Sequence, residues 1–229
     1  MRVLAHRCYR NGPEPSLEND LAAFQRCLDD GLSAEIDIRR WEDGSFYISH
    51  DPRPFSEHLR AEPFFQALSR SEIAPIALNI KELGQERDTL NFLKRFEVIN
   101  HMFLFDMELL EETPGNTARL FRSHDPDVPL AARVSDRNEP IEQALGIKEA
   151  EYIWLDEMDS LWATEDTITT LRSAGKKIYA ISPEIHGFGE EAMIGRWRQF
   201  ADWNIEGICT DYPDRLTEFL DQAEVNWRP

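Results

Sequence analysis

The residues best suited to chemistry lie in the first quarter of the chain and comprise two histidines, His6 and His50, and two acids, Glu35 and Asp37. Carboxylates two positions apart in an extended segment share one face, where they form a hard oxygen site suited to Mg²⁺ or Ca²⁺. The two imidazoles can act as general acid and general base near neutral pH. The alternative is that both acids are solvated and the histidines incidental. Unpaired acids inside an apolar strand would, however, be costly to bury.

A tight hairpin is expected to bring His50 to the two acids. The run that carries the acids and the run that ends at His50 are too close in sequence for a parallel crossover, so they must pair antiparallel. Asp43-Gly44 is typical of a two-residue hairpin turn. That turn predicts a register in which His50 faces Asp37, with the two Cβ atoms about 5 Å apart.

Short apolar runs alternate with helix-patterned stretches along the whole chain. The runs cover residues 2–6, 34–40, 75–81, 101–106, 129–134, 151–156, 177–182 and 207–211. A helical pattern beginning near Leu21 stops at Gly31, and a second over 167–175 ends at another glycine. We predict an α/β fold, a TIM (β/α)₈ barrel with a β-hairpin extension of strand 2, as a single domain over residues 1–229. A doubly wound open sheet is the alternative.

Ionisable residues recur where the predicted strands end. They are His6, Arg7, Asp37, Lys81, Asp106, Arg133, Asp156, Glu184 and Asp211. In both architectures active sites lie at the carboxyl ends of the strands, so this placement favours an enzyme. It also puts His6 beside the two acids if consecutive strands pair, as they usually do.

The composition excludes several functional classes. The chain has 229 residues, 41% of them hydrophobic, which indicates a globular protein. A net charge of −18 repels a phosphate backbone, so no nucleic-acid partner is expected. A phosphate site in such a chain needs local positive charge, which a divalent cation can supply. No apolar run approaches the roughly 20 residues that span a bilayer. The N-terminus lacks a secretory apolar region, so we expect a cytoplasmic protein with no integral membrane segment.

The motifs around these residues resemble the signature of the glycerophosphodiester phosphodiesterase family. That family has an HR pair, an EN pair, an ExDhR strand, a DG turn and an HD pair in this order. The matching segments here are His6-Arg7, Glu18-Asn19, Glu35-Ile36-Asp37-Ile38-Arg39, Asp43-Gly44 and His50-Asp51. The stretch GICTDYP at 207–213 resembles the family's last strand, GhhTDxP. The middle of the chain matches by strand order only.

The resemblance implies a (β/α)₈ barrel with one divalent cation, Mg²⁺ or Ca²⁺. It implies hydrolysis of a small-molecule substrate, a glycerophosphodiester or related phosphodiester, to a phosphomonoester and an alcohol. His6 and His50 would be the acid–base pair, and Glu35 and Asp37 would be metal ligands. A phospholipase-D-like or lyase relative would instead release a cyclic phosphate, and a non-catalytic barrel would only bind a phosphate ligand. The sequence carries no feature that fixes an oligomeric state.

Four further residues are expected to bind or surround the substrate. Arg7 would clamp the phosphate, for which a planar guanidinium is well suited. Glu18 would orient neighbouring groups, or only complement a helix dipole. Lys81 would neutralise a phosphate oxygen or pair with one of the two acids. Glu184 follows a strand and could contribute to the site, whereas His186 is expected in a surface loop.

One position departs from the family's pattern. Where the family has E-h-K, with the glutamate as third metal ligand, this chain has Asn79. An amide oxygen can coordinate a hard cation but brings no charge, so weaker binding is predicted. Asp106, Asp156 and Glu184 are the acids at strand ends that could supplement it.

Overall fold

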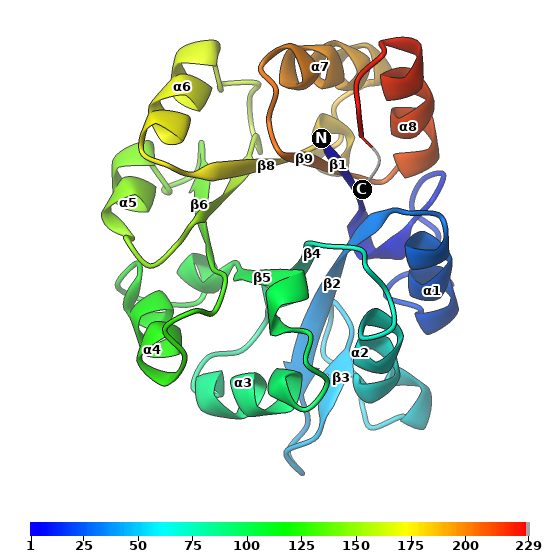
Figure 1. Ribbon diagram of the computed structural model, residues 1–229, viewed down its shortest axis with the longest axis vertical. Coiled ribbons are helices and arrows are strands. Elements are labelled where there is room, and N and C mark those ends of the chain that lie inside the picture. The colour runs from blue at the N-terminus through cyan, green and yellow to red at the C-terminus, as the bar shows by residue number, and fades with distance from the viewer. Residues whose placement is uncertain (228–229) are drawn as a thin grey trace.

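The apolar runs of the sequence form the strands of a barrel in the computed structural model, which describes residues 1–227 (Figure 1). The strands are β1 (Arg2–Ala5), β2 (Ser33–Arg40), β3 (Phe46–Ile48), β4 (Ile76–Ile80), β5 (Met102–Phe105), β6 (Ala131–Ser135), β7 (Tyr152–Asp156), β8 (Lys177–Ile181) and β9 (Gly207–Thr210). The helices are α1 (Leu21–Asp29), α2 (Glu62–Leu68), α3 (Glu86–Lys94), α4 (Asn116–His124), α5 (Ile141–Gly146), α6 (Glu165–Ser173), α7 (Glu190–Asp202) and α8 (Pro213–Gln222). Five short 3₁₀ segments complete the described part: η1 (His6–Cys8), η2 (Glu57–Leu59), η3 (Ile99–His101), η4 (Met107–Leu109) and η5 (Pro183–His186).

Eight parallel strands follow one another around the barrel in the order β5-β4-β2-β1-β9-β8-β7-β6. Between β5 and β6 the ring closes by a single parallel bridge, in which Leu104 pairs with Leu130. The Leu104 amide there donates to the Pro129 carbonyl at 3.0 Å. The helices stand outside the ring of strands (Figure 1). The predicted TIM barrel is confirmed, and the open-sheet alternative is wrong.

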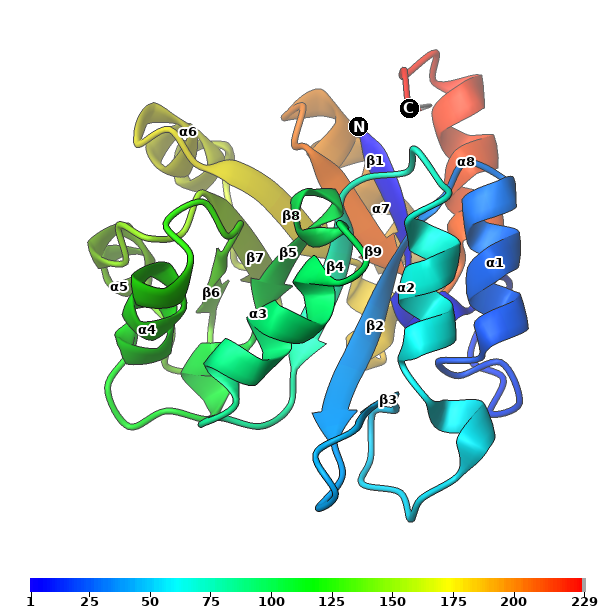
Figure 2. The same ribbon diagram turned by 60° about the horizontal axis from the view of Figure 1, so that its bottom comes forward.

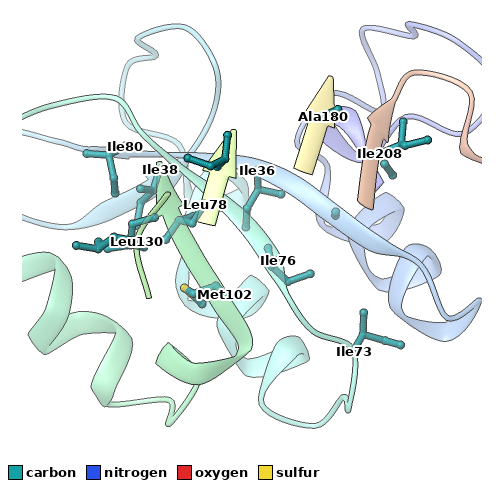
Figure 3. Packing of buried hydrophobic residues seen from close by; sticks show 14 of the residues in the cluster. Ile36, Ile38, Ile73, Ile76, Leu78, Ile80, Met102, Leu130, Ala180 and Ile208 are labelled. Carbon is teal, nitrogen blue, oxygen red and sulfur yellow. The ribbon is translucent and has the colours of Figure 1, made fainter. Parts of the chain in front are cut away.

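Side chains of each strand alternate between two apolar layers because successive residues point to opposite faces. Outward residues such as Ile36 and Leu78 belong to a large cluster that also contains residues of the surrounding helices (Figure 3). Inward residues such as Phe103, Trp154 and Tyr179 form a second cluster that fills the barrel. The inward positions nearest the carboxyl ends are polar, and they build the site described below.

The two predicted helices are present, with boundaries set by their caps. The Asp20 side chain accepts from the Ala23 amide at 2.9 Å at the start of α1, and Gly31 follows the helix with φ +77°. Helix α6 begins at Glu165, two residues earlier than predicted, because Thr164 forms a capping box there. None of the helices in residues 1–227 is long and apolar enough to cross a membrane.

The hairpin extension of β2 is present, but its predicted register is wrong. Arg40 pairs with Phe46, and the Trp41 amide donates to the Ser45 carbonyl at 2.9 Å. The loop therefore has three residues, 42–44, and its last residue, Gly44, has φ +87°. A three-residue loop with a glycine in the left-handed region is the common alternative to a two-residue turn.

The extra loop residue shifts the ladder by one position. The Ser49 amide donates to the Asp37 carbonyl at 3.0 Å, so His50 does not face Asp37 across the hairpin. Strand β3 ends at Ile48, and the chain turns away from the ladder before His50. Figure 2 shows the hairpin extending beyond the ring of strands. His50 therefore reaches the barrel mouth by the turn after β3 and not by cross-strand pairing.

Candidate active site

A cavity of about 230 Å³ lies at the carboxyl ends of the barrel strands. Its polar lining consists of His6, Arg7, Glu35, Asp37, His50, Asn79, Lys81, Asp106, Arg133, Asp156 and His186. Its apolar lining consists of Phe105, Leu109, Trp154, Met158, Ile181, Ile185 and Cys209. All predicted site residues except Glu18 and Glu184 are in this lining. A larger groove of about 700 Å³ between α7 and α8 contains none of them.

The two acids of β2 are buried on the inward face of the barrel. Glu35 is 2% exposed and accepts from the Arg7 backbone amide at 3.1 Å. Asp37 is fully buried; its Oδ2 accepts from Asn19 Nδ2 at 2.8 Å, and its backbone amide donates to Asn19 Oδ1. Burial, and then the charge of Asp37, raise the pKa of Glu35 to about 7. Burial beside a second carboxylate therefore disfavours the ionised form of Glu35.

Arg7 lies directly after β1 in a left-handed backbone conformation with φ +47°. Its Nη1 is 3.7 Å from Glu18 Oε1 and its Nε is 3.9 Å from Asp37 Oδ2. The Nε is buried and has no hydrogen-bond partner. Arg7 lines the cavity, where its guanidinium is suited to an anionic ligand. Glu18 lies at ion-pair distance from it and accepts from the Tyr9 hydroxyl at 3.1 Å.

His6 is oriented by an acid from the last strand's end. Its Nδ1 lies 2.7 Å from Asp211 Oδ1. Burial opposes the charged imidazolium, but the hydrogen bond to Asp211 and the charge of Glu35 outweigh it, so the pKa of His6 is raised. Glu184 lies behind this pair, where it accepts from the Asp211 amide at 3.1 Å and from the Thr210 hydroxyl. Glu184 thus supports Asp211 and does not line the cavity.

His50 is held at the cavity by its own backbone. Arg39 donates from Nε and Nη2 to the His50 carbonyl at 2.9 and 2.7 Å. The His50 Nδ1 is 3.0 Å from the exposed carboxylate of Asp51. Burial and the nearby charge of Lys81 lower the pKa of His50. The pKa values of the two cavity histidines are therefore shifted in opposite directions, upward for His6 and downward for His50.

Asp37 and Asn79 occupy paired positions on β2 and β4. Asp37 Oδ1 and Asn79 Oδ1 are both buried without a hydrogen-bond partner. Lys81 Nζ is 3.2 Å from Asp37 Oδ1, within ion-pair distance but outside hydrogen-bonding geometry. Residues 1–227 contain no group of three or more His, Cys, Asp or Glu side chains placed to hold a metal ion. The residues that could hold a hard cation here are Glu35, Asp37 and, through its amide oxygen, Asn79.

The opposite wall of the cavity is built around Arg133, whose side chain is 4% exposed. Its Nη1 donates to Asp106 Oδ1 at 2.6 Å and its Nη2 donates to Asp156 Oδ2. Burial opposes this charge, but the two carboxylates outweigh it and raise the pKa of Arg133. His186 Nε2 bonds to Asp156 Oδ1. The expectation that His186 belongs to a surface loop is wrong, because His186 lies in η5, lines the cavity and has a side chain that is only 19% exposed.

Three residues with no role assigned from sequence support the site. Asn19, Arg39 and Asp211 bond to Asp37, His50 and His6, respectively. Each had a signal: Asn19 is in the EN pair, Arg39 lies on the same strand face as the two acids, and Asp211 ends a strand. Their partners are distant in sequence or set by loop shape, so only the folded chain identifies the contacts.

No protein-family model matches the sequence, and no curated protein matches it. Solved structures match over nearly the whole chain. A glycerophosphodiester phosphodiesterase from Parabacteroides distasonis has 14% sequence identity and a TM-score of 0.74, with 97% of this chain and 98% of that chain covered. This is the fold of the glycerophosphodiester phosphodiesterases.

Two further structures with this fold cover the chain to a similar extent. A phosphodiesterase from Oleispira antarctica, in complex with the product sn-glycerol-3-phosphate, has 15% identity and a TM-score of 0.68 over 96% of this chain and 97% of that chain. The glycerophosphodiester phosphodiesterase of Thermotoga maritima has 18% identity and a TM-score of 0.56 over 94% of this chain and 96% of that chain. At these low sequence identities, the structural match shows a shared fold.

Proposed function

We propose that this protein is a phosphodiesterase that hydrolyses a glycerophosphodiester, or a related small phosphodiester, to a phosphomonoester and an alcohol. The observation that carries the proposal is the meeting of His6 and His50 in one cavity with Arg7 and Lys81. The two imidazoles supply acid–base catalysis, and the positively charged side chains of Arg7 and Lys81 bind the phosphate. The shared fold supports the proposal, since one structure with this fold holds sn-glycerol-3-phosphate as its product.

The partners of the two histidines favour different roles. His50 has a lowered pKa and is neutral near pH 7, so it accepts the proton of the attacking hydroxyl or water. His6 has a raised pKa and a buried bond to Asp211, both of which favour its protonated form, so we assign His6 as the group that donates a proton to the leaving alcohol oxygen. Asp211 and Asp51 each engage an Nδ1 atom, which leaves the Nε2 atoms for the substrate.

A divalent cation, Mg²⁺ or Ca²⁺, is part of this proposal. Glu35, Asp37 and Asn79 would hold it, because two of them present buried acceptor oxygens that lack donors. When bound, the cation supplies charge that stabilises the anionic phosphate. Arg7, in the cavity lining, binds a non-bridging phosphate oxygen through its guanidinium, and Lys81 adds charge beside Asp37.

The test of the proposal is the His50→Ala variant, assayed with a panel of glycerophosphodiesters in the presence of each divalent cation. Turnover should fall at least about 100-fold, the lower end of general acid–base contributions. His124→Ala is the matched control, since His124 ends α4 and does not line the cavity. Near-normal turnover in His50→Ala with an intact fold would contradict the assignment.

Product analysis separates hydrolysis from the cyclising alternative. Phosphorus NMR should show a phosphomonoester as the final product, whereas a lyase would accumulate a cyclic phosphate. No turnover of any substrate in saturating Mg²⁺, Mn²⁺ or Ca²⁺ would instead support a non-catalytic phosphate-binding barrel.

A further inference from the structure

The amide of Asn79 is held in one direction inside the barrel. Asn79 is 7% exposed, and its Nδ2 donates to Asp106 Oδ2 at 2.9 Å. Its Oδ1 is buried, has no hydrogen-bond partner, and belongs to a residue that lines the cavity. An amide has a donor side and an acceptor side, so the direction of the bond to Asp106 decides which side faces the cavity.

Asp106 can only accept from Asn79 because of its other partner. Its Oδ1 receives Arg133 Nη1 at 2.6 Å, and Arg133 is anchored on its far side by Asp156. A carboxylate paired with a guanidinium offers only acceptors to its other neighbours. Asp106 also has a left-handed backbone, with φ +69°, directly after β5. Non-glycine residues in that region are uncommon and concentrate at functional sites.

A second acceptor oxygen without a hydrogen bond belongs to the residue paired with Asn79, and the ammonium of Lys81 lies 3.2 Å from it. That residue is Asp37 on β2, and the oxygen is its Oδ1. An acid at position 79 would place a carboxylate against Asp106 Oδ2, where the amide now donates at 2.9 Å. With Asp106 and Arg133 in place, only the amide gives position 79 both a bond to Asp106 and an acceptor toward the cavity.

We propose that Asp106 is a positioning residue that fixes the Asn79 amide with its carbonyl oxygen toward the cavity, beside Asp37 Oδ1. This pair of oxygens serves the divalent cation, and that part of the inference rests on the proposed function. Position 79 carries a neutral amide. The nearest acid that bonds to it, Asp106, lies one strand away and is neutralised by Arg133.

The decisive variant is Asp106→Asn, which keeps the shape of the side chain. Arg133 donates to the new amide's oxygen, so the new NH₂ group faces Asn79. Asn79 must then turn its carbonyl to position 106 and its NH₂ group to the cavity. Isothermal titration with MgCl₂ and CaCl₂ should show cation affinity at least about tenfold weaker, as for other residues that orient metal ligands.

Exchanging the side chains of positions 79 and 106 should restore the cation affinity that Asp106→Asn loses. In the double variant Asn79→Asp with Asp106→Asn, the amide at position 106 still accepts from Arg133 and donates to the acid at position 79. Cation affinity should return to the wild-type value or exceed it. Asn79→Asp alone should not tighten cation binding, because its carboxylate meets Asp106. Wild-type affinity in Asp106→Asn, or no recovery in the double variant, would overturn the proposal.

A second measurement does not depend on the cation. The side-chain NH₂ protons of Asn79, followed by NMR, should exchange slowly with solvent in the wild type and faster in Asp106→Asn. Unchanged exchange overturns the positioning role. If exchange changes as expected but the wild type binds neither Mg²⁺ nor Ca²⁺, the positioning role stands and the cation of the proposed function fails.

Glu157→Gln is the matched control for loss of a buried ion pair. Glu157 is fully buried and bonds to Arg196 outside the cavity lining. This variant should lower thermal stability without changing cation affinity or the exchange of the Asn79 amide. A merely structural role for Asp106 would make the two variants behave alike.

Discussion

At the scale of single residues, the two cavity histidines differ in the acids that hold them. Asp211 is 5% exposed and supported by Glu184, whereas Asp51 is an exposed residue on the loop after β3. A buried carboxylate favours the imidazolium more strongly because water screens it less. Against the opposing effect of burial, the hydrogen bond to Asp211 helps to raise the pKa of His6. Burial and the charge of Lys81 lower the pKa of His50, and the exposed Asp51 does not compensate.

Asp211→Asn should therefore move the alkaline limb of the pH profile of kcat/KM to lower pH. The active form needs protonated His6, and removing its anionic partner lowers the pKa of His6, so the proton is lost at lower pH. The limb is measured from initial rates across pH 5–10, and we expect kcat/KM to fall on the order of tenfold near pH 8 because of the lost proton donor.

Asp51→Asn is the companion variant for that profile. It removes the acid beside His50 and should shift only the acidic limb, slightly and to lower pH, because the exposed Asp51 carboxylate is well screened. An unmoved alkaline limb in Asp211→Asn would contradict the assignment of His6 as the acid.

At the scale of elements, the β2–β3 hairpin determines where His50 lies. The three-residue loop sets the ladder, β3 stops at Ile48, and Arg39 captures the carbonyl of His50. The shape of this loop depends on Gly44, whose φ of +87° is disfavoured for any residue with a Cβ atom. A Cβ there would also lie 3.0 Å from Arg40 Nη2.

Gly44→Ala should lower the free energy of unfolding by about 1–2 kcal/mol, the cost of a left-handed non-glycine residue. Gly195→Ala should change the free energy of unfolding in the opposite direction, since Gly195 is exposed within α7 and a Cβ there meets nothing within 4 Å. That change should stabilise the protein by about 0.5–1 kcal/mol. Urea unfolding of both variants measures the difference, and equal effects would refute the role given to the loop.

At the scale of the whole molecule, the net charge of −18 means that a site for an anionic substrate must gather positively charged groups locally. The cavity concentrates Arg7, Lys81 and Arg133 in its lining, yet the pKa of Glu35 is still raised to about 7. A bound divalent cation would relieve that cost in the folded state alone. Cation binding should therefore appear as added stability.

Adding Mg²⁺ or Ca²⁺ at about 100 times its Kd to EDTA-treated protein should stabilise the fold by about 2.7 kcal/mol. For a chain of this size, that corresponds to a rise in Tm of roughly 5–10 °C. His50→Ala should keep the rise, and Glu35→Gln combined with Asp37→Asn should lose it. NaCl at matched ionic strength controls for general screening of the net charge. No rise beyond that control would argue against the cation site.

The sequence by itself determined the barrel and most of the cavity lining. Strand period, helix stops and polar strand ends are local signals, and parallel strands place their carboxyl ends together, so Glu35, Asp37 and Lys81 could be assigned to one mouth. The family resemblance added Asn79.

The tertiary structure decided the contacts that loop shape and distant partners control. The three-residue loop that displaced His50 from Asp37 differs from the predicted turn by one residue, and both loop lengths are common in hairpins. The bond of His6 to Asp211 spans nearly the whole chain. The direction of the Asn79 amide depends on Arg133, two strands away, through Asp106. Hydrogen-bond direction among buried groups is a property of the assembled network, and no pattern within one segment carries it.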